Sequence, residues 1–266
     1  MKFTFGIITH GKSPHISQVL TSILNLNIPK DKFEIIVVGG VDVTGHDDNI
    51  RWFDFNETLK ETQDIARFGW ITVKKNIITQ NAKYENIVFS HDYYFFNPGW
   101  YEGYLGFGND WDICMNVIKR KEGDRFRDWA AWDDRNLCFT AEVDDYERYK
   151  LGNYGKDHRV VLVPYSYNKT ENLYVSGGYW VAKKSHMIKF PLNELLRAGG
   201  ADGIAEDVSW SKEWSGHVSY RMNVHSSNTV LKSGKRLSCN YSLDGKTVSD
   251  RCPMEWAASG WERRLS

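Results

Sequence analysis

The sequence predicts an α/β fold built on a mostly parallel central sheet. Residues 3–9 and 33–38 are apolar runs rich in β-branched and aromatic residues, and residues between them repeat apolar side chains at helical spacing. A strand, a helix and a second strand in this order form a right-handed βαβ unit, which makes the two strands parallel. Polar residues follow the predicted strands, where folds of this kind bind their ligands.

The first half of the chain alternates strands with helices. After the first strand, Ser13 is expected as the N-cap of a helix and Pro14 as its first residue. Apolar residues then recur every three or four positions up to Leu24, which predicts a helix. The next elements are expected as strand 33–38, closed by a glycine pair, short strand 51–55, helix 72–82 and strand 85–90.

The second half is expected to contain less regular structure. Residues 119–150 combine many charges with weak periodicity, which indicates either a loop over an acceptor or an excursion packed on the sheet. Regular structure resumes at 159–164, in a strand over 175–182 and in a strand that ends at His225. Two helices are expected, near 192–198 and over 204–214.

Composition excludes several classes of protein. The 34 basic and 34 acidic residues cancel, so no global attraction to nucleic acid or to an anionic membrane is expected. The four cysteines lack the spacing of a zinc or disulfide framework. The first residues are too polar for a signal peptide and no apolar run is long enough to span a bilayer, so a cytoplasmic protein without an integral membrane segment is expected.

Residues 6–13 match the phosphate-loop pattern GxxxxGK[ST]. In that pattern a glycine-rich loop presents backbone N–H groups and a lysine, here Lys12, to phosphates. The positions between the glycines include Ile7 and Ile8, and β-branched residues suit an anion-binding loop poorly. A strand that turns into a helix is therefore the favoured interpretation, and the phosphate loop is the alternative.

Three further sites carry side chains that could do chemistry. Asp92 follows the strand over 85–90 and can hold Mg²⁺ or Mn²⁺, or can instead cap the following turn. Glu206 and Asp207 open a predicted helix, where they either complement the helix dipole or supply a general base. His225 is either a structural histidine or a ligand.

The chain order of these features resembles that of the GT-A glycosyltransferases: a βαβ unit, an acidic residue after a later strand, an acidic pair that opens a helix, and a late histidine. The resemblance is to the large inverting family of bacterial polysaccharide and lipopolysaccharide transferases in particular. Residues 5–12 and 33–40 are similar to the first βαβ unit of that family, and residues 72–76 to its basic-residue-plus-asparagine motif. His91-Asp92-Tyr93 stands in the place of its DxD motif, and Glu206-Asp207 in that of its catalytic acidic pair.

The resemblance implies a GT-A-type, Rossmann-like sheet flanked by helices, with a smaller mixed second sheet. It implies one catalytic domain over 1–266, in which 1–110 bind the nucleotide, 111–235 form the acceptor-binding and catalytic half, and 236–266 are a C-terminal extension. The expected activity is transfer of a sugar from a UDP- or GDP-sugar to a hydroxyl of a glycan or other acceptor. The expected chemistry is inverting and assisted by Mn²⁺ or Mg²⁺.

The resemblance also assigns roles to individual residues. It implies a metal site formed by Asp92 and His225, and a base supplied by Asp207 or Glu206. Gly177 and Gly178 would shape the sugar and acceptor site, with Trp180 stacking on a ring. The residues expected to contact the nucleotide or its phosphates are Thr9, Gly39, Gly40, Asp42, Lys75, Asn76, His91 and Tyr93.

Two departures from the family pattern leave other functions open. Tyr93 replaces the second aspartate of DxD, and Gly39-Gly40 replaces the usual acidic residue after the second strand. The abundance of tryptophan and the lost aspartate favour, as an alternative, a carbohydrate-binding module or a transferase that has lost its activity. A nucleotidyltransferase and a phosphate-loop enzyme are the other enzyme classes considered.

Overall fold

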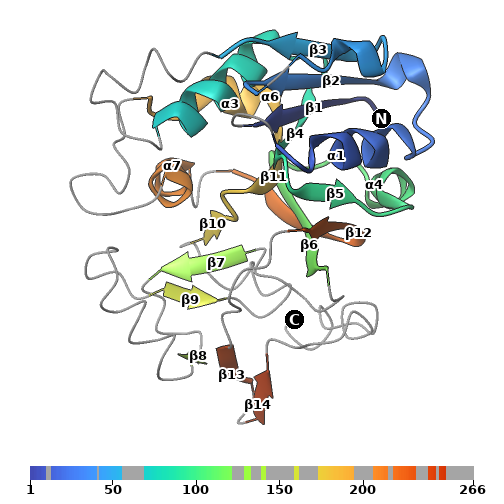
Figure 1. Ribbon diagram of the computed structural model, residues 1–266. Helices are drawn as coiled ribbons and strands as arrows, with labels where there is room; N and C mark the ends of the chain where they lie inside the picture. The colour runs from blue at the N-terminus through green and yellow to red at the C-terminus, as the bar shows by residue number, and fades with distance from the viewer. Residues whose placement is uncertain are drawn as a thin grey trace.

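The structure is a computed structural model. It describes residues 1–9, 13–40, 42–55, 69–121, 129–132, 139–141, 159–161, 173–194, 206–214, 218–231, 239–243 and 246–249. Its main feature is an eight-stranded sheet (Figure 1). The strands are β1 (Phe3–Ile8), β2 (Phe33–Val38), β3 (Ile50–Phe53), β4 (Asn86–His91), β5 (Tyr94–Phe96), β6 (Ile113–Arg120), β11 (Tyr179–Lys183) and β12 (Tyr220–Val230).

The strand order is β3-β2-β1-β4-β11-β6-β12-β5. Strands β3, β2, β1 and β4 are parallel, and β6 and β12 are parallel to each other. Because β11 is antiparallel to both β4 and β6, these two groups point the same way, and only β11 and β5 run against them. The expected mostly parallel central sheet is confirmed.

Helices flank both faces of this sheet (Figure 1). They are α1 (Ile16–Leu24), α3 (Gly69–Asn81), α4 (Trp100–Phe107), α6 (Lys184–Lys189) and α7 (Glu206–Trp214), with 3-10 turns η1 (Lys30–Lys32) and η2 (Thr44–His46).

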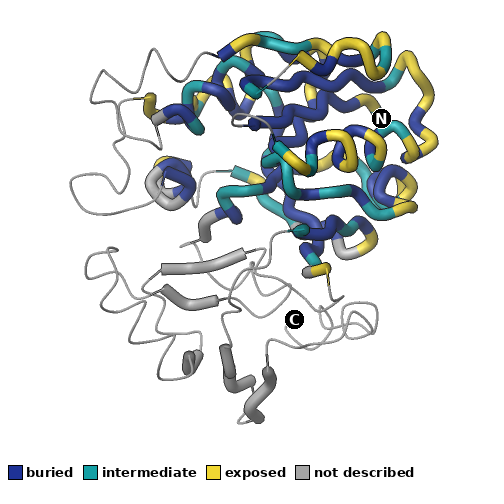
Figure 2. Tube along the Cα trace, in the orientation of Figure 1, coloured by how far each residue is buried: buried dark blue, intermediate teal, exposed yellow. Residues whose placement is uncertain are grey.

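Strand β1 shows why the two faces differ, since its side chains alternate between them. Phe3 and Phe5 pack their rings on Trp100 of α4. Gly6 faces the other way, and a Cβ there would collide with Ile78 of α3. A glycine at this position therefore lets α3 lie directly on the sheet, and the strands are buried on both sides (Figure 2).

Two smaller sheets lie below the central one in Figure 1, in place of the single mixed sheet that we expected. Their described pairs are all antiparallel. The first has the order β10-β7-β9 and the second β14-β13-β8. Their strands are β7 (Trp129–Trp132), β8 (Phe139–Ala141), β9 (Arg159–Val161), β10 (Leu173–Val175), β13 (Cys239–Leu243) and β14 (Lys246–Ser249).

Several elements differ from expectation. Helix α1 begins at Ile16 after an N-cap at His15, and the Ser13 hydroxyl accepts a hydrogen bond from the His15 N–H (3.3 Å). The strand expected over 175–182 is split into β10 and β11 by a turn at Gly177 and Gly178. Leu192 is not helical, and residues 195–198 of the helix expected there lie outside the described residues.

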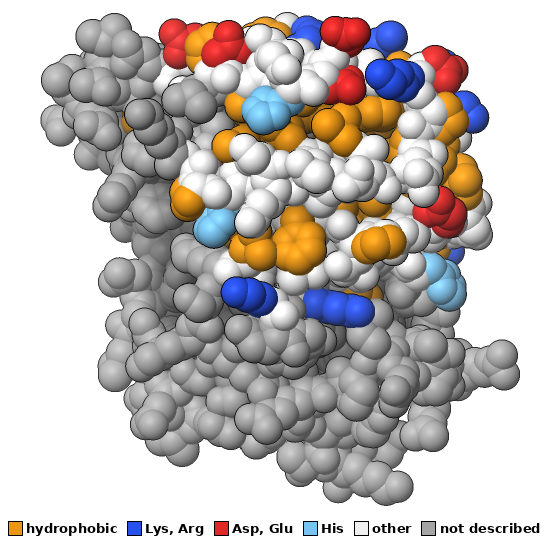
Figure 3. Space-filling view, turned by 45° about the vertical axis from the view of Figure 1, so that its right-hand side comes forward, with side chains coloured by type: hydrophobic (Ala, Val, Ile, Leu, Met, Phe, Trp, Pro, Cys, Tyr) orange, Lys and Arg blue, Asp and Glu red, His pale blue; other side chains and the backbone are white. Residues whose placement is uncertain are grey.

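The expected elements include no counterpart of α4, α6, β5, β6, β7, β8, β13 or β14. The extension 236–266 is described only in β13 and β14. In the part of the chain that the structure describes, no helix has the length and apolar character needed to cross a bilayer. On the face in Figure 3, hydrophobic side chains lie in the middle among backbone and uncharged side chains, and acidic side chains lie mainly at the upper edge.

Candidate active site

Several of the predicted site residues lie at one edge of the sheet, where β1, β2 and β4 end. The parallel register aligns Ile8 with both Val38 and His91, so the residues that follow these strands lie side by side. Strand β11 runs the opposite way, so its first residue, Tyr179, pairs with Ser90 at the same edge. The turn before β11 and the start of α7 therefore join the ends of β1 and β4.

A hydrogen bond links the ends of β1 and β4. The Thr9 hydroxyl donates to Asp92 Oδ2 at 2.6 Å, and the Thr9 N–H donates to Val38 O at 3.1 Å. Thr9 is buried and Asp92 is half-buried. Because a carboxylate has about four acceptor positions, this contact orients Asp92 without exhausting its capacity to bind a ligand.

The end of β2 approaches the same point through Gly39 and Gly40, which have φ values of +90° and +70°. A Cβ on Gly39 would lie 2.5 Å from Thr9 O and 3.1 Å from Lys74 Nζ, so only glycine fits. Buried Lys74 donates to Thr9 O at 2.6 Å. Sequence reasoning did not single out Lys74, although it is the basic residue that lies beneath the ends of β1 and β2.

Asp42 lies further out and is fully exposed. Its Oδ1 accepts hydrogen bonds from the Thr44 N–H (2.9 Å) and the Thr44 hydroxyl (2.7 Å). Both hydrogen bonds favour the ionised carboxylate and so lower the pKa of Asp42, and the bond from the Thr44 N–H has the larger effect. The carboxylate closes a local turn, which is a role it fills without a nucleotide.

The acidic pair is buried beside Lys75. Glu206 and Asp207 open α7, and the Lys75 side chain, 1% exposed, lies 3.9 Å from Glu206 Oε1. Burial lowers the pKa of Lys75 to about 8, although the negative charges of Glu206 and Asp207 act to raise it. Burial raises the pKa of Glu206 to about 7, and the Asp207 charge adds to this rise while Lys75 counters it. Glu206 therefore changes its protonation near neutral pH.

The glycine turn packs directly against the acidic pair. A Cβ on Gly177 would lie 2.8 Å from Asp207 Oδ2, and one on Gly178 would lie 2.6 Å from Tyr94 Oη. The Gly177 carbonyl accepts a hydrogen bond from Lys75 Nζ at 2.8 Å. The two expected glycines thus bring the Asp207 carboxylate close to the end of β4.

Trp180, Lys75 and Asn76 do not have the surroundings that we expected. Trp180 is 0% exposed and packs between Phe89 (5.1 Å between centroids) and Trp210 (5.4 Å), so its ring supports the site from beneath and offers no face to a sugar. Lys75 contacts Glu206 of the acidic pair. Asn76 is buried, and its amide group donates hydrogen bonds to Leu192 O and Glu194 Oε1 and accepts one from the Leu192 N–H.

Tyr93 follows Asp92 in the turn after β4 and is close enough to Glu206 for that charge to affect its pKa. Burial raises the pKa of Tyr93 far above its usual value, and the charges of Tyr94, Asp92 and Glu206 add to the rise. The phenol therefore stays neutral and offers an O–H donor. His91 lies at the same corner, with its N–H bonded to Gly178 O (3.0 Å) and its ring 5.3 Å from that of Tyr93.

The structure does not bring His225 to Asp92. His225 is exposed in a bulge of β12 and is followed six residues later by Leu231, whose N–H donates to Tyr93 O. The next residue, Ser226, donates its hydroxyl to Trp100 O, and Trp100 packs on Phe3 at the opposite end of β1 from Thr9, so His225 and Asp92 lie too far apart to share a metal ion. Among the described residues, no group of three or more His, Cys, Asp or Glu side chains is placed to hold a metal. Of the predicted pair of metal ligands, only Asp92 lies at this edge of the sheet.

Gly6, Ile7 and Ile8 lie in β1, with both isoleucines buried. These residues form a regular strand and not a phosphate-binding loop. Lys12 lies outside the described residues.

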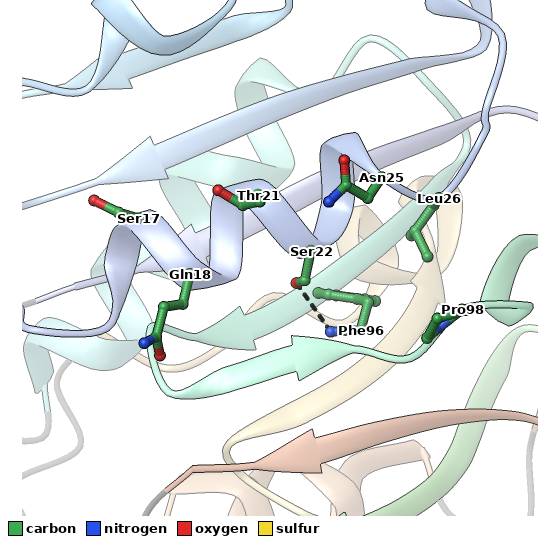
Figure 4. Close-up of a pocket in the computed structure, with 8 residues that line it drawn as sticks. All are labelled: Ser17, Gln18, Thr21, Ser22, Asn25, Leu26, Phe96 and Pro98. Carbon is green, nitrogen blue, oxygen red and sulfur yellow. Dashed lines mark hydrogen bonds between the residues drawn. The ribbon is translucent and has the colours of Figure 1, made fainter.

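A separate groove of about 440 Å³ runs between α1 and β5 (Figure 4). Its lining contains none of the predicted site residues and consists of Ser17, Gln18, Thr21, Ser22, Asn25, Leu26, Phe96 and Pro98.

Comparisons with known proteins agree with this architecture. The chain is similar in structure to GalNAc-T7 crystallised with UDP, GalNAc and Mn²⁺ (TM-score 0.55, 11% identity, 88% of this chain and 44% of that chain). It is also similar to residues 1–349 of S. aureus TarS with UDP-GlcNAc (TM-score 0.52, 13% identity, 89% and 60%). The chain thus spans about half the length of these proteins. No family model and no curated protein sequence matches it.

The protein therefore has a GT-A-like glycosyltransferase fold. At 11% to 13% identity the likeness establishes the fold alone, so the activity must be argued from the site.

Proposed function

We propose that the protein transfers a sugar from a nucleoside-diphosphate sugar to an acceptor hydroxyl. One observation carries this proposal: the Gly177–Gly178 turn is hydrogen-bonded to His91, next to Asp92, and packs against Asp207 of the acidic pair. Asp92 would serve the donor and Asp207 the acceptor, and their nearness through this turn is the arrangement that sugar transfer needs.

The nucleotide would bind where β1 and β2 end, at the carboxyl edge of the parallel strands, where Gly39 and Gly40 turn the chain with positive φ values. Lys74 would contribute positive charge beneath this point. The structures of GalNAc-T7 with UDP and TarS with UDP-GlcNAc favour a UDP-sugar as the first donor to test, with GDP-sugars second.

Asp92 is the residue that would hold Mn²⁺ or Mg²⁺. Tyr93 stays neutral and His225 is distant, so the described residues offer one carboxylate ligand, with donor phosphate oxygens and water completing the shell. A bound divalent cation would offset the charge that develops on the leaving nucleoside diphosphate.

Asp207 would act as the base. Its carboxylate lies against the glycine turn, whereas Glu206 is paired with Lys75. In an inverting transfer the acceptor oxygen attacks the anomeric carbon, the bond to the β-phosphate oxygen breaks with its electron pair, and the acceptor proton goes to Asp207. The nucleoside diphosphate leaves on the opposite side, towards Asp92.

A donor screen tests this proposal. UDP- and GDP-sugars are supplied with candidate acceptors, with and without Mn²⁺, and release of nucleoside diphosphate is measured. Asp92→Ala is expected to lose stabilisation by UDP and metal, and Asp207→Asn to keep donor binding while losing transfer. Asp48→Ala, at an exposed turn, serves as the control and should behave like the unaltered protein. Transfer that survives in Asp207→Asn would refute the assignment of the base.

A second candidate is a domain that binds a nucleotide sugar or carbohydrate without turnover. Tyr93 in place of an aspartate favours it, because the described site then holds fewer metal-binding carboxylates. Saturable binding of UDP-sugar, with no release of UDP for any acceptor or for water, would support this function over transfer.

A further inference from the structure

Lys75 lies where three elements of the site meet. It projects from α3 and is 1% exposed. Its ammonium group donates to the Gly177 carbonyl at 2.8 Å, lies 3.9 Å from Glu206 Oε1 and sits 4.0 Å from the centroid of the Trp180 ring. One cation therefore touches the turn before β11, the first residue of α7 and the ring that supports both.

Stability alone does not account for a lysine at this position. Removing an ammonium group from water costs several kcal/mol, and buried ion pairs can often be replaced by apolar residues without loss of stability. Next to a large ring such as that of Trp180, an apolar side chain would fill the same volume. The charge is therefore better explained by what it holds in place.

The groups that Lys75 holds are the two neighbours of the Asp207 carboxylate. Glu206 precedes Asp207 in the chain, and Gly177 packs against Asp207 so tightly that a Cβ would come within 2.8 Å of Oδ2. Fixing both neighbours restricts the main chain and the side chain of Asp207 together. A carboxylate that must accept a proton along one direction benefits from such restriction.

We propose that Lys75 is a positioning residue, which fixes Asp207 through Glu206 and Gly177 and so aims the base at the acceptor. This inference rests on the proposed glycosyl transfer. It differs from a role in binding the donor phosphates, which the basic residue of this helix was expected to have. A phosphate ligand contributes to donor affinity, whereas a positioning residue contributes to turnover.

The test compares Lys75→Met and Lys75→Arg with a matched control, Lys183→Met. Lys183 is also a buried lysine, with Nζ 2.7 Å from Asn86 Oδ1 and 4.2 Å from the centroid of Trp111. It lies at the last residue of β11, at the opposite edge of the sheet from the site. The control therefore reproduces the loss of a buried cation next to a tryptophan without touching Asp207.

Donor affinity is measured by calorimetry with UDP and Mn²⁺, and kcat by transfer at saturating donor. In Lys75→Met we expect kcat to fall about 10- to 100-fold while the Kd for UDP stays within about twofold. Lys75→Arg should recover part of kcat, because it keeps the charge. Lys183→Met should keep both quantities even if its melting temperature falls. If Lys75→Met does not fold, Glu206→Gln, which removes the same ion pair, should show the same split.

Two results would overturn the inference. A tenfold rise in the Kd for UDP at unchanged kcat would make Lys75 a donor ligand, and an unchanged kcat and Kd would leave it no role in the site. A wild-type protein that binds UDP-sugar but never transfers it would instead refute the proposed function, and the positioning role with it. The binding measurement thus separates the two failures.

Discussion

The sharpest prediction concerns Gly177, where one added methyl group should disable the base. A Cβ at this position would lie 2.8 Å from Asp207 Oδ2, 3.0 Å from Cγ and 3.3 Å from Cβ, whereas ordinary contacts begin at 3.4 Å. Gly177→Ala therefore displaces the carboxylate by about 0.6 Å (3.4 minus 2.8) or moves the turn by as much. Since a misplacement of about 1 Å can cost about 100-fold in rate, kcat should fall by roughly tenfold or more.

The assay is initial-rate release of nucleoside diphosphate at saturating donor and acceptor. Gly106→Ala is the matched control, because a Cβ at this exposed position of α4 meets nothing within 4 Å. That substitution should leave kcat unchanged and stabilise the helix by up to about 1 kcal/mol. A folded Gly177→Ala protein whose kcat stays within twofold of the wild type would refute the close packing of the turn on Asp207.

Three further predictions follow from the same edge of the sheet. Gly39→Ala should lower the melting temperature and abolish stabilisation by UDP. The reason is that φ is +90° and the new Cβ would lie 2.5 Å from Thr9 O. A normal thermal shift with UDP would contradict this prediction. Glu206 has a pKa of about 7 in the folded protein, against 4.5 in the unfolded chain. Between these two values the folded state binds more protons than the unfolded state does. The contribution of Glu206 to the free energy of unfolding therefore falls as pH rises from about 4.5 to about 7. Glu206→Gln should remove up to about 3 kcal/mol of this pH dependence in chemical denaturation, and parallel curves for the two proteins would exclude it. Tyr93→Asp should restore a second carboxylate and lower the Mn²⁺ concentration needed for half-maximal UDP binding by about tenfold; an unchanged requirement would place the metal away from this corner.

The elements that could be predicted are those with strong local signals. Strands β1, β2 and β4 are long apolar runs, and the residues that follow them were identified because chain order alone places them at one edge. Strand β5 has three residues and exists because it pairs with β12, more than a hundred residues away, so it has no local signal. Strand β6 does carry an apolar run, from Ile113 to Ile118, that could have been recognised.

Side-chain surroundings were harder to predict than position along the chain. Lys74 and Lys75 are neighbours on a helix and point about 100° apart, so which one lies beneath Thr9 and which beside Glu206 depends on how α3 packs on Gly6. Trp180 belongs to the predicted strand, but only contact with α7 shows that its ring is covered. His225 was expected to end a strand, whereas β12 continues to Val230 and leaves the histidine at a bulge.

The most direct test of the account is a crystal structure of the protein with UDP and Mn²⁺. We predict the diphosphate at the ends of β1 and β4, with the metal bound to Asp92 and the β-phosphate directed towards the Gly177 turn and Asp207. A nucleotide bound elsewhere, for example in the groove between α1 and β5, would contradict the proposed site.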